Sequence, residues 1–529
     1  MKNKKKSFFF ALIAVVTALA CLLTACNNGG DEVTPDDGNK DEVCEHEWQT
    51  DSTVSGNCKT KGYVVMKCSK CGETKKEEDE DYGDHNYENH VCTICGARQS
   101  GVKDFTSGSL SAALYTENIS FSGETKYSLF LSGNGRMDNY KSSASTPWAS
   151  YVSQIVRLEF EGSAIFIGDN AFSDMASLTT VNFHSAVASI GNGAFKNCTS
   201  LHTLDTGTPL RIIGERAFEG CTSLTTIKGS ASTESVGAFA FYGCNRLSSV
   251  SLGIVGTGSN IECEKAVGAI FGYTTEKFDA RQTVTFGNVD YYYYIPSSLT
   301  EFVILGGQPI ATGAFAGCTN LTSVVFGGEI KRIEEQAFDN AKGVKNVKIE
   351  TNSLEHIGQN AFCGAGITSI VIPATVTAVG GGAFMDCDSL VSVIYEDGSQ
   401  INEVCAYTFA RCTALTEIRL PESMEIIGNY AFLTCSALET IRFTSNITTP
   451  GENCFENCTK LSTIVLDSES VANVDKRSKL FASADNVFIA SGIVPSENSY
   501  LSNYFVNRGK CAEDDVYPGY YHWKRIKKD

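Results

Sequence analysis

A phenylalanine that recurs at a nearly fixed interval constrains this chain more than any other feature. In the stretch IGERAFEGCTSLTTI, Phe218 lies 23 residues after Phe195, which itself lies 23 residues after Phe172. A catalytic residue is normally needed once, whereas a core residue recurs with every repeat, so a period of about 20 to 29 residues predicts a solenoid of stacked coils. Thirteen copies align on this residue: Phe172, Phe195, Phe218, Phe241, Phe271, Phe315, Phe338, Phe362, Phe384, Phe409, Phe432, Phe455 and a degenerate Phe481.

The positions around this phenylalanine each have a packing reason. The consensus reads Ile-Gly-x-x-Ala-Phe-x-x-Cys-x-x-Leu-x-x-Ile-x-Leu. Its last apolar residues, such as Leu415, Ile418 and Leu420, predict one short strand per coil, and strands laddered in parallel give a mostly β fold. The glycine, as at Gly428, is expected to adopt a backbone conformation that other residues avoid.

The cysteine of the consensus is interpreted as a building block rather than a reagent. Met175, Ala341 and Ala365 fill the same position in other copies, so small apolar volume is what the position requires. Cysteine is among the residue types most often buried and packs like a small hydrophobe. Disulfides between stacked copies are the alternative, although their side chains would run parallel rather than face each other. The eight cysteines are Cys198, Cys221, Cys244, Cys318, Cys387, Cys412, Cys435 and Cys458.

Alternation along each strand predicts two columns of outward side chains. The first, from Thr180 to Thr463, is almost wholly hydroxyl, as expected where neighbours hydrogen-bond along a ladder. The second is polar at Asp205 and Lys228 but becomes apolar and basic toward Val465. Apolar patches and arginines are common at interaction sites, although Val and Ile also simply suit strands. The predicted ligand-binding residues are Val325, Lys348, Val371, Ile394, Arg419 and Arg442.

The pattern Ile-Gly-x-x-Ala-Phe-x-x-Cys-x-x-Leu resembles the BspA-like leucine-rich repeat family of bacterial and protist surface proteins, over about residues 155–495. The resemblance implies a curved solenoid with a right-handed coil, and a role in adhesion or ligand binding at the cell surface. Ligands vary within that family, so no partner carries over. Residues 251–305 depart from the period and resemble an insertion common in such proteins. Its tyrosine-rich part around Tyr291 is the alternative binding surface.

The N-terminus is interpreted as an export signal. Residues 1–25 carry four lysines followed by an apolar run that is too short to span a bilayer. The segment ends in Leu-Thr-Ala-Cys26, which resembles the lipobox of bacterial lipoproteins and implies acylation of Cys26 and anchoring at the extracellular face of the bacterial cell membrane. An ordinary signal peptide with a chance cysteine is the alternative. Residues 26–43 are an expected acidic, flexible tether, and the net charge of -18 argues against nucleic acid as a partner.

Residues 44–100 form an expected cysteine and histidine module ahead of the repeats. Two Cys-x-x-Cys-Gly pairs are typical of a zinc ribbon, because each pair presents two thiolates to one tetrahedral ion and the glycine lets the amides of the turn point at sulfur. The expected ion is a structural zinc, and disulfides are the alternative in an exported chain. The candidate metal ligands are Cys68, Cys71, Cys92 and Cys95, with His46 and His85 as possible replacements.

The remaining segments carry no recognisable chemistry. Residues 101–154 lack the repeat and are interpreted as an N-terminal cap, and residues 496–529 as a C-terminal cap. The histidines are scattered, and no nucleophile elbow, P-loop or dinucleotide motif is present, so no enzymatic activity is expected. The predicted function is adhesion, or binding of a protein or glycan ligand on a host or neighbouring cell surface. A structural surface spacer is the alternative, and a hydrolase with an unrecognised site is a remote one.

Overall fold

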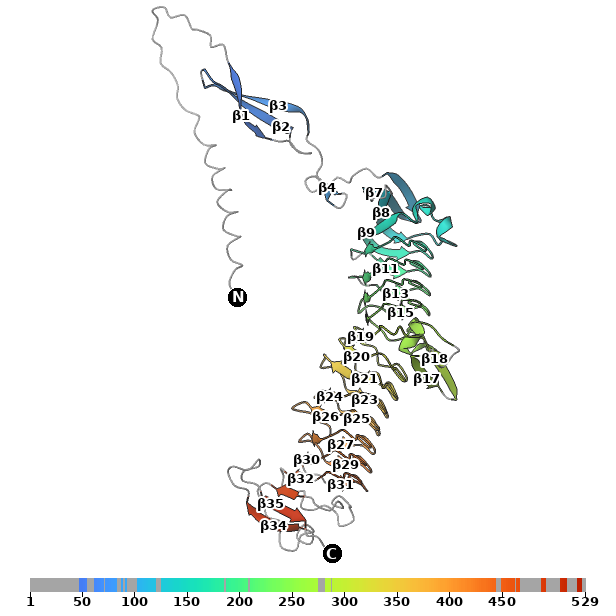
Figure 1. Ribbon diagram of the computed structural model, residues 1–529, viewed down its shortest axis with the longest axis vertical. Helices are drawn as coiled ribbons and strands as arrows, with labels where there is room; N and C mark the ends of the chain where they lie inside the picture. Colours follow the sequence, from blue (N-terminus) through green and yellow to red (C-terminus); the bar gives the residue numbers. More distant parts are fainter. Residues whose placement is uncertain are drawn as a thin grey trace, which may run out of the picture. The chain divides into compact units, whose positions relative to one another are not determined.

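The computed structural model divides the chain into two compact units, residues 1–99 and 100–529, and each is described by itself (Figure 1). Within the described part of the chain, no helix has the length and apolarity needed to cross a bilayer. The described residues are 47–54, 61–70, 72–82, 87–88, 91–92, 102–119, 125–184, 187–207, 210–274, 281–286, 288–443, 449–461, 463–466, 487–490, 505–510 and 521–525.

The first unit contains two small antiparallel sheets. Strand β2 lies between β1 and β3, and β4 pairs with β5. Their bounds are β1 (Trp48–Val54), β2 (Lys61–Cys68), β3 (Thr74–Tyr82), β4 (Tyr87–Glu88) and β5 (Val91–Cys92).

The second unit is a mostly β solenoid whose coils each add one strand to a ladder. The 14 strands of this sheet run parallel as far as β33, after which β35 and β34 close it in antiparallel fashion. In order, they are β12 (Thr203–Asp205), β14 (Thr226–Lys228), β16 (Ser249–Leu252), β19 (Glu301–Ile304), β20 (Ser323–Phe326), β22 (Asn346–Ile349), β24 (Ser369–Ile372), β26 (Ser392–Tyr395), β28 (Glu417–Arg419), β30 (Thr440–Phe443), β32 (Thr463–Leu466), β33 (Val487–Ala490), β35 (Tyr521–Arg525) and β34 (Phe505–Lys510). Strand β28 is shorter than the apolar pattern predicts: Leu415 and Leu420 are buried but lie outside it.

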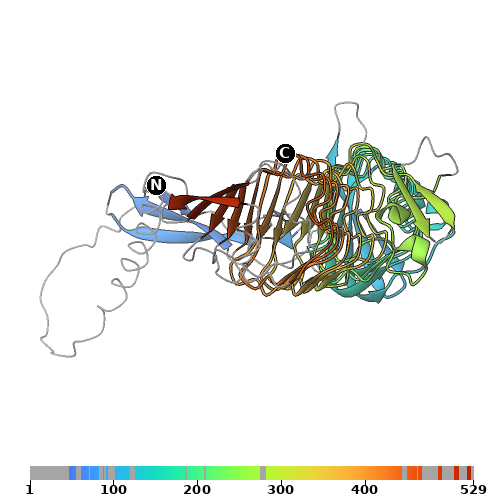
Figure 2. The ribbon, with the colours of Figure 1, turned by 90° about the horizontal axis from the view of Figure 1, so that it is seen from below.

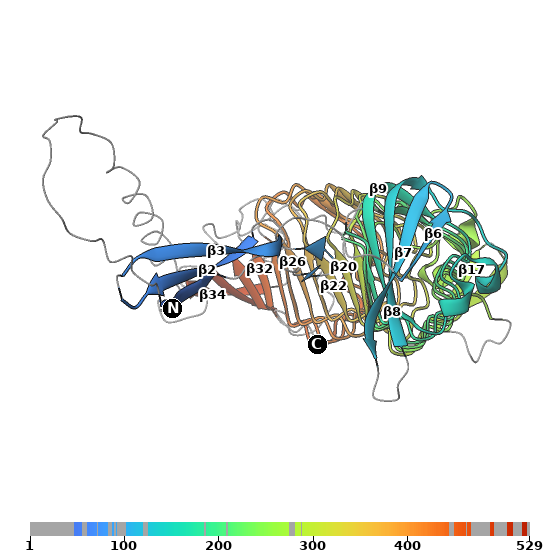
Figure 3. The same cartoon turned by 90° about the horizontal axis from the view of Figure 1, so that it is seen from above.

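A second row of strands lies on another side of the solenoid, and in the repeating coils most of them are only two to four residues long. Seen from either end, successive coils are displaced sideways in steady steps, from the earlier coils drawn in green to the later ones drawn in orange (Figures 2 and 3). The first sheet of this row contains β6 (Lys103–Ser107), β7 (Leu110–Ile119), β8 (Thr125–Arg136), β9 (Ile155–Ile167), β11 (Val187–Ile190), β13 (Ile212–Ile213) and β15 (Ser235–Val236), with β10 (Thr180–Asn182) pairing to β9. Two later sheets contain β21 (Arg332–Ile333), β23 (His356–Ile357) and β25 (Ala378–Val379), then β27 (Glu403–Val404), β29 (Ile426–Ile427) and β31 (Thr449–Pro450).

The repeated phenylalanine forms the core, as its period predicts. All 12 copies from Phe172 to Phe455 have at most 5% of their surface exposed, whereas Phe481 lies outside the described residues. Most rings stack on the ring of the next coil, with centroids 5.2 Å apart between Phe195 and Phe218, for example. Trp148, which the sequence analysis did not single out, stacks on Phe172 at 5.5 Å and begins this row. Trp148 lies between two short 3-10 helices, η1 (Ser143–Ser145) and η2 (Ala149–Tyr151).

The recurring cysteine makes one hydrogen bond to the preceding coil in most copies. The Cys221 thiol is fully buried and donates to the carbonyl oxygen of Phe195 in the preceding coil, at a sulfur–oxygen distance of 3.2 Å. Burial raises the pKa of this thiol to about 12, so the group stays protonated. The building-block interpretation is therefore confirmed for Cys221. The same bond is made by Cys198, Cys244, Cys387, Cys412, Cys435 and Cys458.

The glycine of the consensus is needed for a reason other than the expected one. Gly428 does not have a positive φ; instead, a Cβ atom there would lie 2.5 Å from the backbone nitrogen of Ala406 in the preceding coil. Close approach of two backbones therefore excludes a side chain. The left-handed conformations occur elsewhere in the coil, directly before Ala-Phe and directly before the cysteine, as at Tyr430 (φ 59°) and Thr434 (φ 60°).

One insertion interrupts the regular coils. It contains η3 (Glu262–Glu264), η4 (Val267–Ile270) and a hairpin of β17 (Gln282–Phe286) and β18 (Val289–Tyr293), which lies on the far side of the coils from β19 and β20 (Figure 1). The buried amide of Gln282 accepts from the backbone of Gly268 at 2.7 Å and donates to Ala314 at 3.1 Å. One side chain thus bridges two coils through hydrogen bonds to the backbone of both.

Candidate functional site

The predicted ligand-binding residues occupy one row across the ladder. Strand register pairs Val371 with Ile394, Ile394 with Arg419, and Arg419 with Arg442. Val325 pairs with Lys348, but between β22 and β24 only Asn346 and Ser369 are in register. The contiguous part of the row therefore runs from Val371 to Arg442.

Exposure differs along this row. Val371 is 45% exposed and Ile394 is 55% exposed, whereas Val325 and Arg442 are half-buried. Val465, the next residue of the row, is fully buried, so the stripe ends at Arg442 rather than continuing as expected. We call Val371, Ile394, Arg419 and Arg442 the strand-face stripe.

Sequence reasoning missed two apolar residues near this stripe. Val391, which immediately precedes β26, is 47% exposed. Val303 stands in the same row as Val325, but it lies beside the insertion, where the repeat period fails. Val391 enlarges the exposed apolar surface around Ile394, and its sequence signal is an apolar residue where most copies carry threonine or serine.

A hollow of about 690 Å³ adjoins the stripe at β26 and β28. Ile394 and Arg419 line it, together with the turns that follow the two strands. Arg419 forms no ion pair within the described residues, whereas Lys348 is bound by Glu350 at 2.5 Å. The stripe therefore offers apolar surface, a recess and a guanidinium group, which together suit binding rather than chemistry. The remaining lining residues are Val393, Tyr395, Glu396, Asp397, Gly398, Ser399, Gln400, Leu420, Pro421, Glu422 and Ser423.

The side chains of the first outward column, from Thr180 to Thr463, do not hydrogen-bond to one another along the ladder as predicted. Among the described residues, one side-chain contact of the expected kind is seen, from Ser249 Oγ to the Glu301 carboxylate at 2.9 Å. The repeated bond is instead made one residue earlier, where Thr225 donates to the carbonyl oxygen of His202 at 3.0 Å. The same bond to the preceding coil is made by Thr179, Ser248, Thr300, Thr322 and Thr368.

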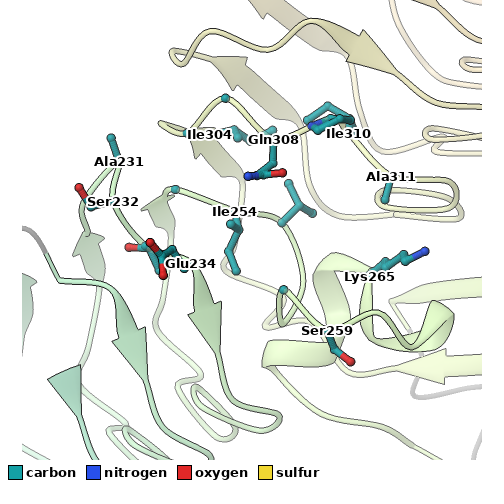
Figure 4. A pocket seen from close by; sticks show the side chains of 17 residues that line it. Ala231, Ser232, Glu234, Ile254, Ser259, Lys265, Ile304, Gln308, Ile310 and Ala311 are labelled. Atoms are coloured by element: carbon teal, nitrogen blue, oxygen red, sulfur yellow. The ribbon is translucent and has the colours of Figure 1, made fainter. Parts of the chain in front are cut away.

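A second hollow, of about 550 Å³, lies where the insertion interrupts the coils (Figure 4). Ile254 and Gln308 face each other across it, while the amino group of Lys265 points away (Figure 4). Glu234, on its rim, is held by two bonds from Arg211, at 3.0 and 2.8 Å. The lining includes neither histidine nor cysteine, and its two ionic side chains are turned to other tasks: Glu234 is bound by Arg211, and the amino group of Lys265 points away (Figure 4).

The cysteine module can be assessed at one knuckle. Cys68 is buried, the backbone amide of Lys70 points at its sulfur at 3.4 Å, and Gly72 has a φ of 79°. An amide directed at sulfur and a glycine after the pair are the features expected of a metal-binding turn. Cys92 belongs to β5, and no cluster of metal-binding side chains is found within the part of the chain that is described. Cys71, Cys95, His46 and His85, like Cys26 of the predicted lipidation site, lie outside the described residues.

The chain belongs to a family defined by its repeats. The model of the BspA type leucine rich repeat region matches residues 149–261, 288–405, 355–484 and 395–507, which together span more than half of the 529 residues. Proteins of this family are cell-surface proteins, and leucine-rich repeat proteins generally bind other proteins and are typically non-catalytic. No curated protein matched the chain.

Three solved bacterial proteins are similar to the chain. A leucine-rich repeat protein from Bacteroides ovatus is 20% identical, covering 69% of this chain and 94% of its own, with a TM-score of 0.29. One from Eubacterium ventriosum is 18% identical, covering 70% and 96%, with a TM-score of 0.23. A leucine rich cell surface protein from Faecalibacterium prausnitzii is 18% identical, covering 70% and 96%, with a TM-score of 0.21.

Proposed function

We propose that this chain is a non-catalytic adhesion protein, anchored by a lipid on Cys26, that binds a protein on a host or neighbouring cell through the strand-face stripe. The observation that carries the proposal is the row of Val371, Ile394 and Arg419, which are in register on adjacent strands and exposed beside a recess. Exposed apolar residues beside an arginine are the composition of a protein interface.

The alternative of a spacer without a ligand is weaker on physical grounds. A spacer needs only a solvated surface, and other copies place Asp205 and Lys228 in the same row. Exposing Val371, Val391 and Ile394 together instead leaves apolar surface in water, which a soluble surface protein avoids unless a partner covers it.

The proposal is tested by changing the stripe without changing the core. Val371→Asp, Ile394→Asp and Arg419→Glu are each expected to weaken binding of the chain from residue 26 onward to immobilised extracellular matrix proteins or whole bacterial cells by at least tenfold, with unchanged melting temperature. Lys228→Glu, in the same row before the insertion, is the matched control and is expected to bind normally. Full binding by all three stripe variants would move the site elsewhere, and no saturable binding by the native chain would favour the spacer.

The lipid anchor is tested separately. Cys26→Ala is expected to release the protein from the membrane fraction, because the acyl chains have no attachment point without the sulfur. The Leu-Thr-Ala-Cys26 sequence supports this proposal. A Cys26→Ala protein that still sediments entirely with membranes would contradict it.

We also propose that the cysteine module holds a structural zinc, with Cys68, Cys71, Cys92 and Cys95 as ligands and His46 and His85 as replacements. The turn around Cys68 supports this, since its amide and glycine geometry suits a thiolate ligand. Elemental analysis of protein purified without chelators is expected to find zinc. Its absence, together with a mass showing paired cysteines, would assign the module to disulfides instead.

A further inference from the structure

The coil that contains β26 departs from the repeat at the inner end of its strand. Strand register aligns Tyr395 with Ile372 of the preceding coil, and both stand where the repeat places an apolar side chain of the core. Tyr395 therefore adds a hydroxyl group that the packing of the core does not require. The residues at the same position in earlier coils are Leu252, Ile304 and Phe326.

The same coil also has a longer turn after its strand. Ile401, the next residue of the hydrophobic core, follows Tyr395 by six positions, whereas Val376 follows Ile372 by four. A Cβ atom on Gly398, in the middle of the longer turn, would meet no atom within 4 Å, so the space beside the turn is open.

The longer turn is held in place by the following coil. The hydroxyl group of Ser423 lies 2.9 Å from the carbonyl oxygen of Ser399 and 2.6 Å from that of Ile401. Residues 395–400 and 419–423 both line the hollow of about 690 Å³ that adjoins the strand-face stripe. The hollow is therefore bounded by turns that are hydrogen-bonded to each other.

Tyr395 brings a polar group without a partner to this hollow. Its half-buried ring packs against the hydrophobic core, and the residue lines the hollow. Within the described part of the chain, its hydroxyl group has no hydrogen-bond partner, and burial raises the pKa of this group above its ordinary value of 10.0. A polar group set into a protein costs free energy unless it is hydrogen-bonded, so a ligand that bonds to it would be stabilised.

Carboxylates outnumber cations around the hollow. The ionic side chains of its lining are Glu396, Asp397, Glu422 and Arg419, three carboxylates against one guanidinium, and all four are exposed. None of the four forms an ion pair with another described residue. No group of side chains in the described ranges is arranged to hold a metal ion, so the carboxylates are spread around the hollow, which suits a larger cationic group.

We propose that this hollow receives a lysine or arginine side chain of the protein that binds the strand-face stripe, an inference that rests on the proposed function and deepens it. Ile394 belongs to both the stripe and the hollow, so a partner on the stripe reaches the hollow directly. The alkyl stem of the basic side chain packs on Ile394 and Pro421, and its charge lies among the carboxylates. The Tyr395 hydroxyl oxygen accepts a hydrogen bond from it.

The probes are hexalysine, hexaarginine and hexaaspartate peptides, with binding to the chain from residue 26 onward measured by calorimetry at physiological ionic strength. The native chain is expected to bind at least one basic peptide and not the acidic one. Asp397→Asn and Glu422→Gln should each weaken this binding about tenfold. Glu329→Gln is the matched control, because it removes one charge from an exposed residue in the corresponding turn of an earlier coil, and it should bind normally.

Tyr395→Phe tests the hydroxyl group alone. It should weaken binding of the basic peptide about threefold, while the melting temperature stays level or rises, because the hydroxyl group that is removed has no partner in the fold. Tyr140→Phe is the control, since the Tyr140 hydroxyl donates to Ser107 Oγ at 2.6 Å. It should lower the melting temperature and leave peptide binding unchanged.

The outcomes separate the hollow from the rest of the stripe. Val371→Asp, which lies outside the hollow, should bind the basic peptide normally while losing the protein partner. Failure of the native chain to bind either basic peptide would overturn the proposal, as would equal weakening by Glu329→Gln, which would trace the binding to the net charge of the chain. Native affinity for the protein partner in Asp397→Asn and Glu422→Gln would also overturn it, and a loss in Val371→Asp would then still support the stripe.

Discussion

The solenoid before the insertion and the solenoid after it have nearly the same interior but different exteriors. Ring centroids of successive phenylalanines lie 5.2–5.6 Å apart from Phe172 to Phe241 and 4.8–5.4 Å apart from Phe315 to Phe455. On the outer row, Asp205 and Lys228 stand in the first part, whereas Val371 and Ile394 stand in the second. Packing allows the interior little variation, so the outer positions are where the two parts can acquire different binding properties.

The mutations with the largest expected effect on the free energy of unfolding test whether the two interiors are equivalent. Phe195→Ala in the first part and Phe384→Ala in the second should each lower the free energy of unfolding by about 3–5 kcal/mol, because each removes a fully buried ring and leaves a cavity. Urea titration followed by circular dichroism measures the loss. Ile212→Ala, at a side chain that is 46% exposed, is the control and should cost far less. A loss below about 1 kcal/mol in either phenylalanine variant would show that its part is loosely packed.

Glycine-to-alanine substitutions, with the next largest expected effect, test the close approach of successive coils. Gly191→Ala and Gly428→Ala should each lower the free energy of unfolding by about 1–3 kcal/mol, because the new Cβ would lie 2.7 and 2.5 Å from backbone atoms of the preceding coil. Thermal melting provides the measurement. Gly398→Ala has a φ of 84° but no atom within 4 Å, so it isolates the effect of backbone conformation alone. Equal losses at all three positions would rule out close approach as the cause.

The free energy of unfolding should decrease with rising pH because of buried thiols in both parts of the solenoid. Burial raises the pKa of Cys221 to about 12 and also raises that of Cys387 above its ordinary value of 9.0. The folded protein keeps these protons when the unfolded chain loses them, so their stabilisation is complete below pH 9 and is lost as pH rises toward the folded pKa. Each such thiol contributes a slope of up to about 1.4 kcal/mol per pH unit.

Urea titrations between pH 8 and 10.5 measure this slope. Cys221→Ala and Cys387→Ala should each reduce it, whereas mutating a residue without an ionisable side chain should leave it unchanged. If neither alanine variant alters the slope, the buried thiols are not its source. Iodoacetamide should label these two thiols at pH 8 only after unfolding.

The smallest effect concerns the exterior of the first part. Asp205→Val and Lys228→Ile should each change the free energy of unfolding by less than about 0.5 kcal/mol, because both side chains are exposed on the ladder. Binding to the partner of the strand-face stripe should also keep its native affinity. A weakened affinity would show that the first part of the row contributes to the same interface.

The sequence predicted the features that recur in every coil, but it did not predict the features that depend on contact between successive coils. The period of Phe172 to Phe455 predicted the buried rings, and the cysteine position was interpreted correctly, because identical side chains at a fixed interval have a single packing explanation. The role of Gly428 was assigned wrongly, since close approach and positive φ both favour glycine and only coordinates separate them.

The candidate sites were predictable to different extents. Alternation placed Val371, Ile394 and Arg419 in one row, but the burial of Val465 depends on neighbours that the period does not describe. The stacking of Tyr407 on Tyr430, with ring centroids 5.1 Å apart, was not predicted either, because the residue before Ala-Phe varies freely in type. What those residues share is a backbone angle, which leaves no pattern of hydrophobicity to detect.

The bridge made by Gln282 has a mechanical consequence. Among the described residues, no ring contact joins Phe271 to Phe315. The hydrogen bonds on this side come from the Gln282 amide, from Val267 to Ala314 and from Thr319 to Arg281. A protein held at one end and pulled at the other carries tension through every coil in series. The stack should therefore yield first at this joint, extending in two force steps in a single-molecule pulling experiment.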